Sequence, residues 1–572
     1  MEEIELARPD RSRKWGFPNF AFLKILSLKG RFFDRRFSLS LDRSWTGLRD
    51  RILAEGAKAW KKGIGRSGSF GENGRMSKRT VRSVFGLWLC FGLGLTAVWK
   101  QAQAQSGPIR PLPNVILCMA DDLGWADTGF QGSRIVKTPH MDRIVRHGIR
   151  FTRWYSGAPV CSPTRGSCLT GRHPYRYGVF SANVGHMRPQ EVTLAEALRA
   201  AGYTTGHFGK WHLGTLTTKV KDSNRGGPRN LKHYSPPWEN GFDVCFSTEA
   251  KVPTWNPLER PKQFRPGESL RYGWVPRESP DEVTFYGTRY WVGPDQPIEH
   301  GLRGDDSKLI MDHALDFIQK AVQQRRPFFA VIWFHAPHLP VVTGKKYRDL
   351  YRDRPLQEQL YYGAISALDE QMGRLWDTLG RLGVRENTLL WFCSDNGPEV
   401  RTPGSPGPLR GRKRSLYEGG IRVPGFVVWP AVIRKPRTVD VPCSTSDYYP
   451  TVMDILGAYP KYQPRPIDGV SLLPLLQGKE WVRTKPIGFE SGNQVALIGV
   501  RYKLYGVKPR GRKEYRYELY DLWADIGEKH DVSAQHPEIL RKMIHQLEQW
   551  RASCRRSLAG EDYKKGGFSP ED

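Results

Sequence analysis

The chain has 572 residues, a formal net charge of +30, and 39% hydrophobic and 12% aromatic residues. This apolar content supports a folded core and excludes a mainly disordered protein. The glycines and prolines follow no fixed period, which excludes collagen-like and repeat architectures, and eight cysteines are too few for a disulfide scaffold of this length. The positive charge favours anionic partners, whether nucleic acid, anionic lipid or an acidic substrate.

Residues 76–104 have the layout of a secretory signal peptide. Met76 opens a basic segment, an apolar run follows over residues 84–98, and small residues precede Gln105. A membrane anchor is the alternative, but the run is shorter than the roughly 20 residues that span a bilayer. We therefore expect export to the periplasm or the extracellular space, with no stable membrane insertion after the signal is cleaved.

Residues 1–75 precede this signal, although signal peptides begin chains. We expect translation to start at Met76, which makes residues 1–75 a mis-called upstream extension. A genuine N-terminal extension is the alternative.

The elements predicted for the exported part alternate between helices and buried strands. An apolar run at residues 114–119 predicts the first strand and ends abruptly before Asp121. Later apolar runs follow amphipathic helical patterns, and this repeated order predicts a largely parallel sheet covered by helices. The predicted helices are 193–201, 306–322 and 356–382, the strands that follow them are 203–208, 328–334 and 388–393, and residues 215–303 are predicted to be long insertion loops.

After Pro442 the pattern changes. A helix is followed by alternating segments at residues 496–505 and 515–522, and then by a final amphipathic helix at residues 537–552. This order predicts a small α+β domain with an antiparallel sheet.

The most informative stretch is Cys-Ser-Pro-Thr-Arg-Gly-Ser-Cys-Leu-Thr-Gly-Arg at residues 161–172. Ser162 followed by Pro163 predicts a helix start, and Gly171 suits its carboxyl end. Cys161 would therefore lie at the positive end of a helix, with Arg165 one turn further along on the same side.

This stretch resembles the signature of the formylglycine-dependent sulfatases, of the arylsulfatase and N-acetylgalactosamine-6-sulfatase type. Thr164 replaces the Ser often found there. Five further segments, in the family's order, resemble its other motifs: Ala-Asp-Asp-Leu-Gly at 120–124, Gly-Lys-Trp-His-Leu-Gly at 209–214, Ala-Pro-His at 336–338, Ser-Asp-Asn-Gly at 394–397, and the segment 413–424. The resemblance implies the alkaline phosphatase superfold, an α/β fold in which helices flank a large mixed, mostly parallel sheet, with a smaller C-terminal α+β domain.

The resemblance also implies a division of the exported chain and a chemistry. The expected parts are a catalytic domain at 108–440, a C-terminal α+β subdomain at 441–556 and a tail at 557–572. In such enzymes the signature Cys is oxidised to Cα-formylglycine, whose hydrated aldehyde is the nucleophile. Cys161 would be that residue, and a formylglycine-generating maturation enzyme would be a partner.

A metal site is predicted where two strands end. Asp121 and Asp122 follow one strand, Asp395 and Asn396 follow another, and such positions converge in parallel α/β sheets. Oxygen ligands suit Ca²⁺ or Mg²⁺ rather than zinc, while the alternative is ordinary turn chemistry. The resemblance favours Ca²⁺ over Mg²⁺ and adds residue 161 to the ligands.

Three cations are expected to face the sulfuryl oxygens: Arg165, Lys210 and Lys413. By resemblance, Arg165 also holds the formylglycine hydrate, while the two lysines contact sulfate. Solvated surface charge is the alternative, above all for Lys413, which lies among several arginines. Its position five residues before Glu418 selects it from that cluster.

Two histidines are expected to move protons, because the unperturbed imidazole pKa of about 6.5 suits that role. By resemblance, His212 takes a proton from the hydrate, whereas His338 binds sulfate and helps to protonate the leaving alcohol. His335 is the alternative to His338, and a satisfied core histidine is the alternative for either role.

These features together predict a sulfuric ester hydrolase acting on a sulfated glycan or small molecule, with carbohydrate preferred and no nucleic acid partner. Hydrolysis of phosphonate or phosphate esters on the same scaffold is the first alternative, and a non-catalytic polyanion-binding protein is the second. Residues 501–516 offer either a polyanion site or a solvated hairpin. Four tryptophans of the insertion region offer either sugar stacking or loop anchoring: Trp238, Trp255, Trp274 and Trp291.

Overall fold

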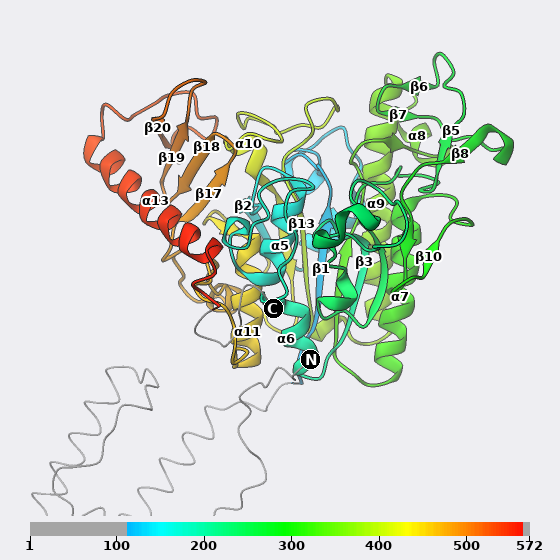
Figure 1. The fold of residues 1–572 in the computed structure, drawn as a ribbon, viewed down its shortest axis with the longest axis horizontal. Coiled ribbons are helices and arrows are strands. Elements are labelled where there is room, and N and C mark those ends of the chain that lie inside the picture. Colours follow the sequence, from blue (N-terminus) through cyan, green and yellow to red (C-terminus); the bar gives the residue numbers. More distant parts are fainter. Residues whose placement is uncertain (1–110, 564–572) are drawn as a thin grey trace, which may run out of the picture. The chain divides into compact units, whose positions relative to one another are not determined.

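The computed structural model describes residues 111–563 (Figure 1). The predicted signal at 76–104, the segment 1–75 and the last residues of the predicted tail lie outside this range. Within it, no helix combines the length and apolar character needed to cross a bilayer.

Eleven strands of the described chain form one mixed sheet, in the order β10-β9-β4-β3-β11-β1-β13-β14-β2-β15, with β16 also paired to β2. The five central strands, β4 to β13 in this order, run parallel. The bounds are β1 Asn114–Ala120, β2 Gly148–Tyr155, β3 Thr204–Lys210, β4 Val244–Thr248, β9 Tyr290–Trp291, β10 Pro297–Ile298, β11 Phe328–Trp333, β13 Thr388–Ser394, β14 Arg422–Val428, β15 Arg437–Val439 and β16 Cys443–Ser444.

The sheet is buried on both faces because its central strands carry apolar side chains on both sides. In β1, Ile116 and Cys118 pack on one face against α7 (Asp306–Gln323) and α9 (Leu356–Arg381). Leu117 and its alternate neighbours pack on the other face, with α5 (Cys161–Thr170), α6 (Leu194–Ala200) and α11 (Tyr448–Leu456). Figure 1 shows the sheet between these helical layers. The predicted α/β class is thereby confirmed.

Shorter elements complete the fold. They include α4 (Pro139–Val145), α8 (Lys345–Arg348), α10 (Glu418–Ile421), α12 (Leu473–Leu476), and strands β5 (Glu259–Pro261), β6 (Ser269–Leu270), β7 (Gly273–Trp274), β8 (Val283–Phe285) and β12 (Val341–Val342).

The prediction of loops throughout residues 215–303 is wrong in one important respect. β4 (Val244–Thr248) lies within this segment and pairs in parallel with β3, so it belongs to the central sheet. Its five residues, Val-Cys-Phe-Ser-Thr, include two polar ones, and the run is short. Only the neighbouring strand, which supplies its hydrogen bonds, distinguishes it from a loop.

The C-terminal part contains an antiparallel sheet, as predicted, with strands β17 (Ile487–Ser491), β18 (Gln494–Ile498), β19 (Tyr502–Val507) and β20 (Arg516–Asp521). The alternating segment 496–505, predicted as one unit, is divided between β18 and β19, because the Gly499 amide donates to the Tyr502 carbonyl across a turn. Helix α13 (Pro537–Leu558) covers this sheet and extends beyond its predicted end at 552.

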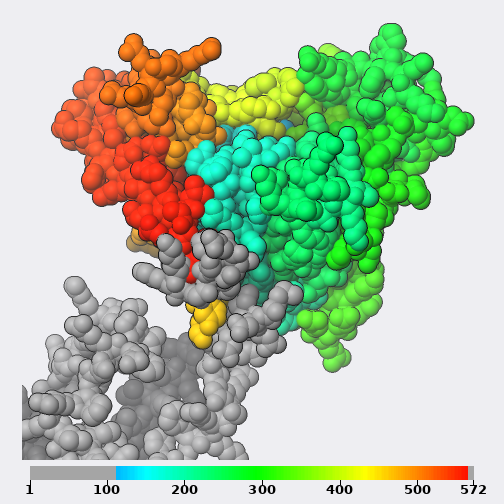
Figure 2. All heavy atoms as spheres, viewed as in Figure 1, coloured from blue at the N-terminus to red at the C-terminus, as the bar shows by residue number. Residues whose placement is uncertain are grey.

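Helix α13 also contacts the catalytic part. It packs against the short 3-10 turn η2 (Pro174–Arg176), which follows α5. Figure 2 shows this helix, in red, directly against the cyan surface that contains these residues. Three basic residues of the predicted polyanion segment, Arg501, Lys503 and Arg516, are engaged in ion pairs, as expected of a folded hairpin.

Candidate active site

The predicted site residues converge at the carboxyl edge of the parallel strands. Asp121 follows β1, Lys210 ends β3, and Asp395 follows β13. β1 pairs directly with β13, and β11 lies between β1 and β3. Side chains that are far apart in sequence therefore meet at one edge, where ligands gather in sheets of this kind.

Cys161 is the first residue of helix α5, which begins two residues earlier than predicted, with Val160 as its N-cap. Gly171 ends the helix at φ 68°, a conformation that glycine adopts without strain. Every residue of α5 is buried. The loop and sheet around the helix therefore hold residue 161 at its positive end, facing the carboxylates.

Arg165 lies one turn further along α5 and joins three parts of the site. Its Nη2 atom donates to Asp395 Oδ2 at 2.7 Å and lies 3.3 Å from Asp121 Oδ2. Its Nη1 atom donates to the Lys210 carbonyl at 3.0 Å, and its guanidinium lies over the Trp333 ring. A fully buried arginine in this position orients the carboxylates as well as supplying charge.

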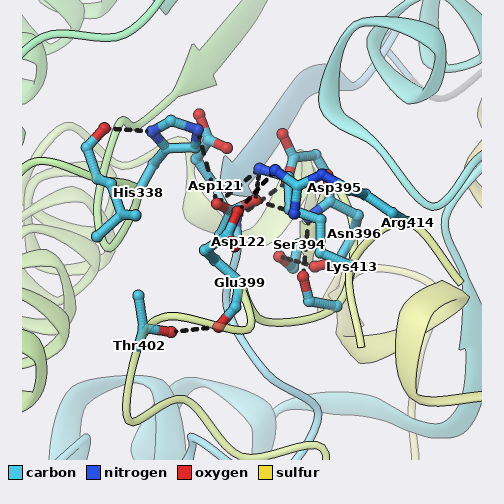
Figure 3. A network of polar contacts seen from close by, with 12 residues as sticks. Asp121, Asp122, His338, Ser394, Asp395, Asn396, Glu399, Thr402, Lys413 and Arg414 are labelled. Atoms are coloured by element: carbon cyan, nitrogen blue, oxygen red, sulfur yellow. Dashed lines mark hydrogen bonds and ion pairs between the residues drawn. The ribbon is translucent and has the colours of Figure 1, made fainter. Parts of the chain in front are cut away.

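The two lysines each hold a different aspartate. Lys210 Nζ donates to Asp121 Oδ2 at 2.6 Å, and Lys413 Nζ donates to both carboxylate oxygens of Asp122 at 2.6 and 2.7 Å. Asn396 Nδ2 donates to Asp122 Oδ1 at 2.7 Å. Figure 3 shows Asp121, Asp122, Asp395 and Lys413 around one centre.

The alternative of solvated surface charge is wrong for Lys413, which is 7% exposed. Its arginine neighbours are bonded elsewhere. Arg410 donates to the Glu528 carbonyl, Arg412 to the Glu399 carbonyl, and Arg414 to the Glu399 carboxylate. The spacing argument thus selected the cation of this cluster that contacts the buried carboxylate of Asp122.

Burial and charge act in opposite directions on the carboxylates. Burial disfavours the ionised form of Asp121, but Lys210, His338 and Arg165 together hold its pKa well below the usual range. Burial and the neighbouring Asp121 raise the pKa of Asp395 to about 7. Burial likewise raises the pKa of Asp122, despite the contact with Lys413. A group of carboxylates that repel one another is stabilised by a multivalent cation.

Two buried oxygen atoms at this centre fit a metal ion. Among the described residues, neither Asp121 Oδ1 nor Asn396 Oδ1 has a hydrogen-bond partner. One ligand atom from each of Asp121, Cys161 and Asp395 lies within 4.8 Å of the others, and the same holds for Asp121, Asp122 and His338. Unsatisfied buried oxygens are costly unless something binds them, and an oxygen-rich set suits a hard divalent cation.

The two candidate histidines of the 335–338 segment differ in their surroundings. His335 is fully buried, and its ring nitrogens lie 2.8 Å from Asp306 Oδ2 and 2.8 Å from Thr248 Oγ1. His338 Nδ1 donates to the Leu339 carbonyl at 2.6 Å, which leaves Nε2 facing Asp122 Oδ2 at 3.6 Å. His335 is therefore a satisfied core histidine, and His338 is the one that reaches the site.

His212 lies two residues beyond β3 in a left-handed conformation at φ 59°. Its Nε2 atom donates to Asn183 Oδ1 at 2.9 Å, and its buried Nδ1 atom has no partner among residues 111–563. Burial and the nearby Lys210 hold the pKa of His212 well below its usual range, so the ring is neutral at working pH.

Sequence reasoning did not identify Asn183 or the role of Ser394. Ser394 Oγ accepts from the Leu123 amide and donates to the Asn396 carbonyl, which connects the two loops that carry the candidate metal ligands. Its position in the Ser-Asp-Asn-Gly motif could have indicated that Ser394 belongs to the site. Asn183 lies far from every motif, and nothing in the sequence marks it as the partner of His212.

The insertion-region tryptophans favour loop anchoring. Trp274 and Trp291 are 7% and 1% exposed, and Trp291 Nε1 donates to Asp222. Trp238 and Trp255 are half-buried.

A buried cysteine at a helix N-terminus, an oxygen-rich cluster that fits a divalent cation, and three fixed cations are features expected of a hydrolase of anionic esters. Comparison with known families agrees with this class. The family model described as Sulfatase matches residues 113–458, and that described as N-sulphoglucosamine sulphohydrolase, C-terminal, matches residues 412–553.

Individual relatives and a solved structure are similar to this chain. Steryl-sulfatase of Rattus norvegicus is 32% identical over 459 residues, covering 68% of this chain and 74% of that protein. N-acetylgalactosamine-6-sulfatase of Canis lupus familiaris is 31% identical over 414 residues, covering 69% and 71%. The solved structure of Ps i-CgsB in complex with k-i-k-neocarrahexaose has a TM-score of 0.63 at 26% identity, covering 77% of this chain and 93% of that one. The chain belongs to the sulfatase family and is a sulfuric ester hydrolase.

Proposed function

We propose that this sulfatase removes sulfate from a sulfated carbohydrate, using a Ca²⁺ ion and a formylglycine made from Cys161. The observation that carries the proposal is the buried centre in which Cys161, three carboxylates and three cations meet. Two relatives support the carbohydrate class through their descriptions, one as an N-acetylgalactosamine-6-sulfatase and one in complex with a neocarrahexaose.

Asp121, Asp122, Asp395 and Asn396 would hold the cation, together with residue 161. When bound, the ion would polarise the sulfuryl group and the formylglycine would supply the nucleophilic hydroxyl. Ca²⁺ accepts the mixed carboxylate and amide oxygens offered here. Mg²⁺ is the less favoured alternative because it demands stricter octahedral geometry.

The remaining residues bind the substrate and move protons. Lys210 and Lys413 would stabilise the sulfuryl oxygens as the S–O bond breaks, while Arg165 orients residue 161. His338 would help to protonate the leaving alcohol through Nε2, and because Nδ1 already donates to the Leu339 carbonyl, this step requires the imidazolium form of the ring. Burial holds the pKa of His338 well below its usual range, so the ring would take up this proton together with the anionic sulfate ester. The neutral His212 would accept a proton at Nδ1, since its Nε2 proton is bonded to Asn183.

The substrate class is tested by comparing kcat/KM for sulfated oligosaccharides, 4-nitrophenyl sulfate and 4-nitrophenyl phosphate. We expect desulfation of at least one oligosaccharide, and aryl phosphate to be the poorer aryl substrate. Activity on aryl sulfate alone would contradict the carbohydrate assignment. Faster phosphate hydrolysis would favour the phosphoesterase alternative, and no hydrolysis by fully modified protein would favour a polyanion-binding role.

The maturation step gives a direct prediction. In active protein, mass spectrometry of the peptide containing Cys161 should find the mass loss expected when the thiol is replaced by an aldehyde. Cys161→Ala should abolish turnover, while Cys168→Ala, on the same helix, should retain the modification at residue 161. Full activity of protein that carries only unmodified Cys161 would contradict this mechanism.

We also propose export through the signal peptide that begins at Met76. The basic segment, apolar run and small residues before Gln105 support it. N-terminal sequencing of the mature protein should begin at or near Gln105, and a mature chain that retains residues 1–75 would contradict it.

A further inference from the structure

A pocket of about 490 Å³ lies in the C-terminal part, between one end of the antiparallel sheet and α13. Its walls are the segment 483–486 before β17, the turn between β18 and β19, and the face of α13 that carries Ile539, Lys542 and Met543. Residues three and four positions apart share one face of a helix. The volume lies within the roughly 300–1,000 Å³ of pockets that bind small ligands, so the pocket can hold one unit of a larger ligand.

The pocket lies apart from the catalytic centre. Gln494, at the start of β18, accepts from the Leu416 amide at 3.0 Å, three residues beyond Lys413. Ile498, at the other end of β18, lines the pocket. Strand residues rise about 3.3 Å each, so the two ends of β18 are roughly 13 Å apart. No lining residue belongs to the catalytic centre, and a ligand bound here would leave that centre free.

The pocket is lined by cations without acidic residues. Four basic side chains line it: Arg483, Lys485, Arg501 and Lys542. No aspartate or glutamate lines it. Arg483 pairs with the buried Asp447 at 2.7 Å. Arg501 pairs with Asp521 at 2.7 Å. These two ion pairs leave the charges of the two lysines uncompensated.

Neither lysine has an acidic partner among residues 111–563. Lys485 is exposed, and its Nζ atom donates to the Ile467 carbonyl at 3.3 Å, which leaves its charge in place. Lys542 is exposed on α13 and forms no hydrogen bond or ion pair, not even with Glu538 one turn before it. A pocket lined by charges of one sign concentrates ions of the opposite sign, so this pocket attracts anionic groups.

The floor of the pocket is apolar and firmly held. Ile498 and Met543 are 0% and 6% exposed. Arg153 of β2, which is also buried, donates to the Gly499 and Val500 carbonyls and so fixes the turn against the large sheet. An apolar floor beneath a basic rim matches a sulfated sugar, because a sugar ring has an apolar C–H face and its sulfates are anionic.

An exposed aromatic side chain extends the basic rim. The Arg501 guanidinium lies 5.0 Å from the Tyr502 ring centre and 5.4 Å from the Trp523 ring centre. Trp523 is 61% exposed. Tryptophan is enriched at binding interfaces, since it offers a large apolar surface with a polar edge. Trp523 therefore provides a flat surface beside the pocket on which a sugar ring can stack.

We propose that this pocket is a second, non-catalytic binding site for the glycan, in which Lys485 and Lys542 contact anionic groups on sugar units away from the sulfate ester that is hydrolysed. Nucleic acids and anionic membranes carry the same charge, but a concave pocket with an apolar floor suits a single sugar unit better than a duplex or a bilayer surface. The site rests on the proposed carbohydrate function, and it raises the effective concentration of a long substrate at the enzyme.

The test measures the binding of dextran sulfate and of uncharged dextran to the active enzyme by isothermal titration calorimetry. Lys485→Ala combined with Lys542→Ala should raise the Kd for dextran sulfate by about 10- to 100-fold, as expected for lost hydrogen bonds to charged groups. The corresponding double arginine variant should bind like wild type. Lys320→Ala combined with Lys435→Ala removes two exposed lysines elsewhere, and this matched control should leave the Kd close to that of wild type. Uncharged dextran should bind far more weakly throughout.

Two further measurements separate this site from the catalytic centre. The double alanine variant should keep the wild-type kcat/KM for 4-nitrophenyl sulfate, because that substrate needs the catalytic centre alone. Trp523→Ala should weaken dextran sulfate binding and likewise leave the aryl sulfate rate unchanged.

Wild-type affinity of the double alanine variant for dextran sulfate, or an equal loss in the lysine control, would overturn the site. Lysine-dependent binding that is tighter for duplex DNA or for phosphatidylserine vesicles than for dextran sulfate would overturn its assignment to carbohydrate. Failure of the wild-type enzyme to hydrolyse any sulfated oligosaccharide would instead overturn the proposed function, and that result is independent of the binding measurement.

Discussion

At the scale of single residues, the site depends on pairing every buried charge. Lys210 neutralises Asp121 and Lys413 neutralises Asp122. Arg165 bridges Asp395 and Asp121. Removing one partner of such a buried pair leaves an uncompensated charge, which costs far more than losing a surface ion pair. Substitutions here should therefore affect both stability and activity.

The proposed role of Asp121 as a metal ligand should be visible in the metal content. Asp121→Ala should remove the bound divalent ion and lower turnover by more than about 100-fold. Substitution of a residue that only supports a metal ligand already lowers metal affinity or activity by about 10- to 100-fold. Elemental analysis by mass spectrometry and steady-state rates measure the two effects. Asp377→Ala, which breaks an exposed ion pair with Arg143, is the control. Unchanged metal and rate in Asp121→Ala would return this residue to an ordinary turn role.

The role of His338 predicts a dependence on the leaving group. A sugar alcohol needs a proton as it leaves, whereas 4-nitrophenolate does not. His338→Ala should slow sugar sulfates by about 10²–10⁴-fold and 4-nitrophenyl sulfate much less. His530→Ala, an exposed histidine, should change neither rate. Equal slowing of both substrates would show that His338 only binds sulfate.

At the scale of elements, a buried charge network joins α10 to the C-terminal sheet. Lys503 of β19 is fully buried between Glu418 of α10, at 3.0 Å, and Glu528, at 2.8 Å. Glu418 in turn accepts from the Tyr155 hydroxyl of β2. The motif segment that carries Lys413 therefore continues into α10, which the C-terminal part stabilises through Lys503.

Lys503→Met should lower the free energy of unfolding by about 3–5 kcal/mol, because it leaves the buried Glu528 without its cation and Glu418 with Arg422 alone. Urea denaturation followed by tryptophan fluorescence measures this change. Lys513→Met, in the exposed hairpin turn, should stay within about 0.5 kcal/mol of wild type. Equal effects of the two substitutions would mean that the network contributes nothing specific.

At the scale of the whole molecule, the catalytic and C-terminal parts are joined through Asp468. Arg176 donates to both of its carboxylate oxygens at 2.7 Å, and Trp550 of α13 donates to Oδ1 at 3.0 Å. The His173 ring packs edge-on against Trp550 with centroids 4.6 Å apart. These contacts attach α13 to the segment that follows α5.

Burial lowers the pKa of His173 to about 3. The unfolded chain binds a proton at this residue below about pH 6.5, whereas the folded chain does not. Stability should therefore fall as pH drops from about 6 towards 3, by up to about 1.4 kcal/mol per pH unit from this residue. In His173→Gln the pH dependence of the unfolding free energy should be flatter than in wild type over this range.

His545→Gln, which changes an exposed histidine of α13, serves as the control and should keep the wild-type slope. A slope in His173→Gln equal to that of wild type would show that His173 is not held neutral in the folded protein.

The sequence by itself determined the parts of this protein that depend on local pattern. No knowledge of distant contacts was needed to predict the apolar strands β1, β11 and β13 or the amphipathic helices α7 and α9. The same is true of the family motifs. The motifs also named the residues that meet at the site. The spacing to Glu418 was enough to select Lys413 from a cluster of arginines.

Only the tertiary structure decided the features that depend on a partner far away in the chain. β4 is a central strand because β3 supplies its hydrogen bonds, and His335 is structural because Asp306 and Thr248 occupy its ring nitrogens. Asn183 gained its meaning in the same way, from the contact with His212. Periodicity and spacing report on neighbours along the chain, whereas hydrogen bonding, burial and charge compensation are set by neighbours in space.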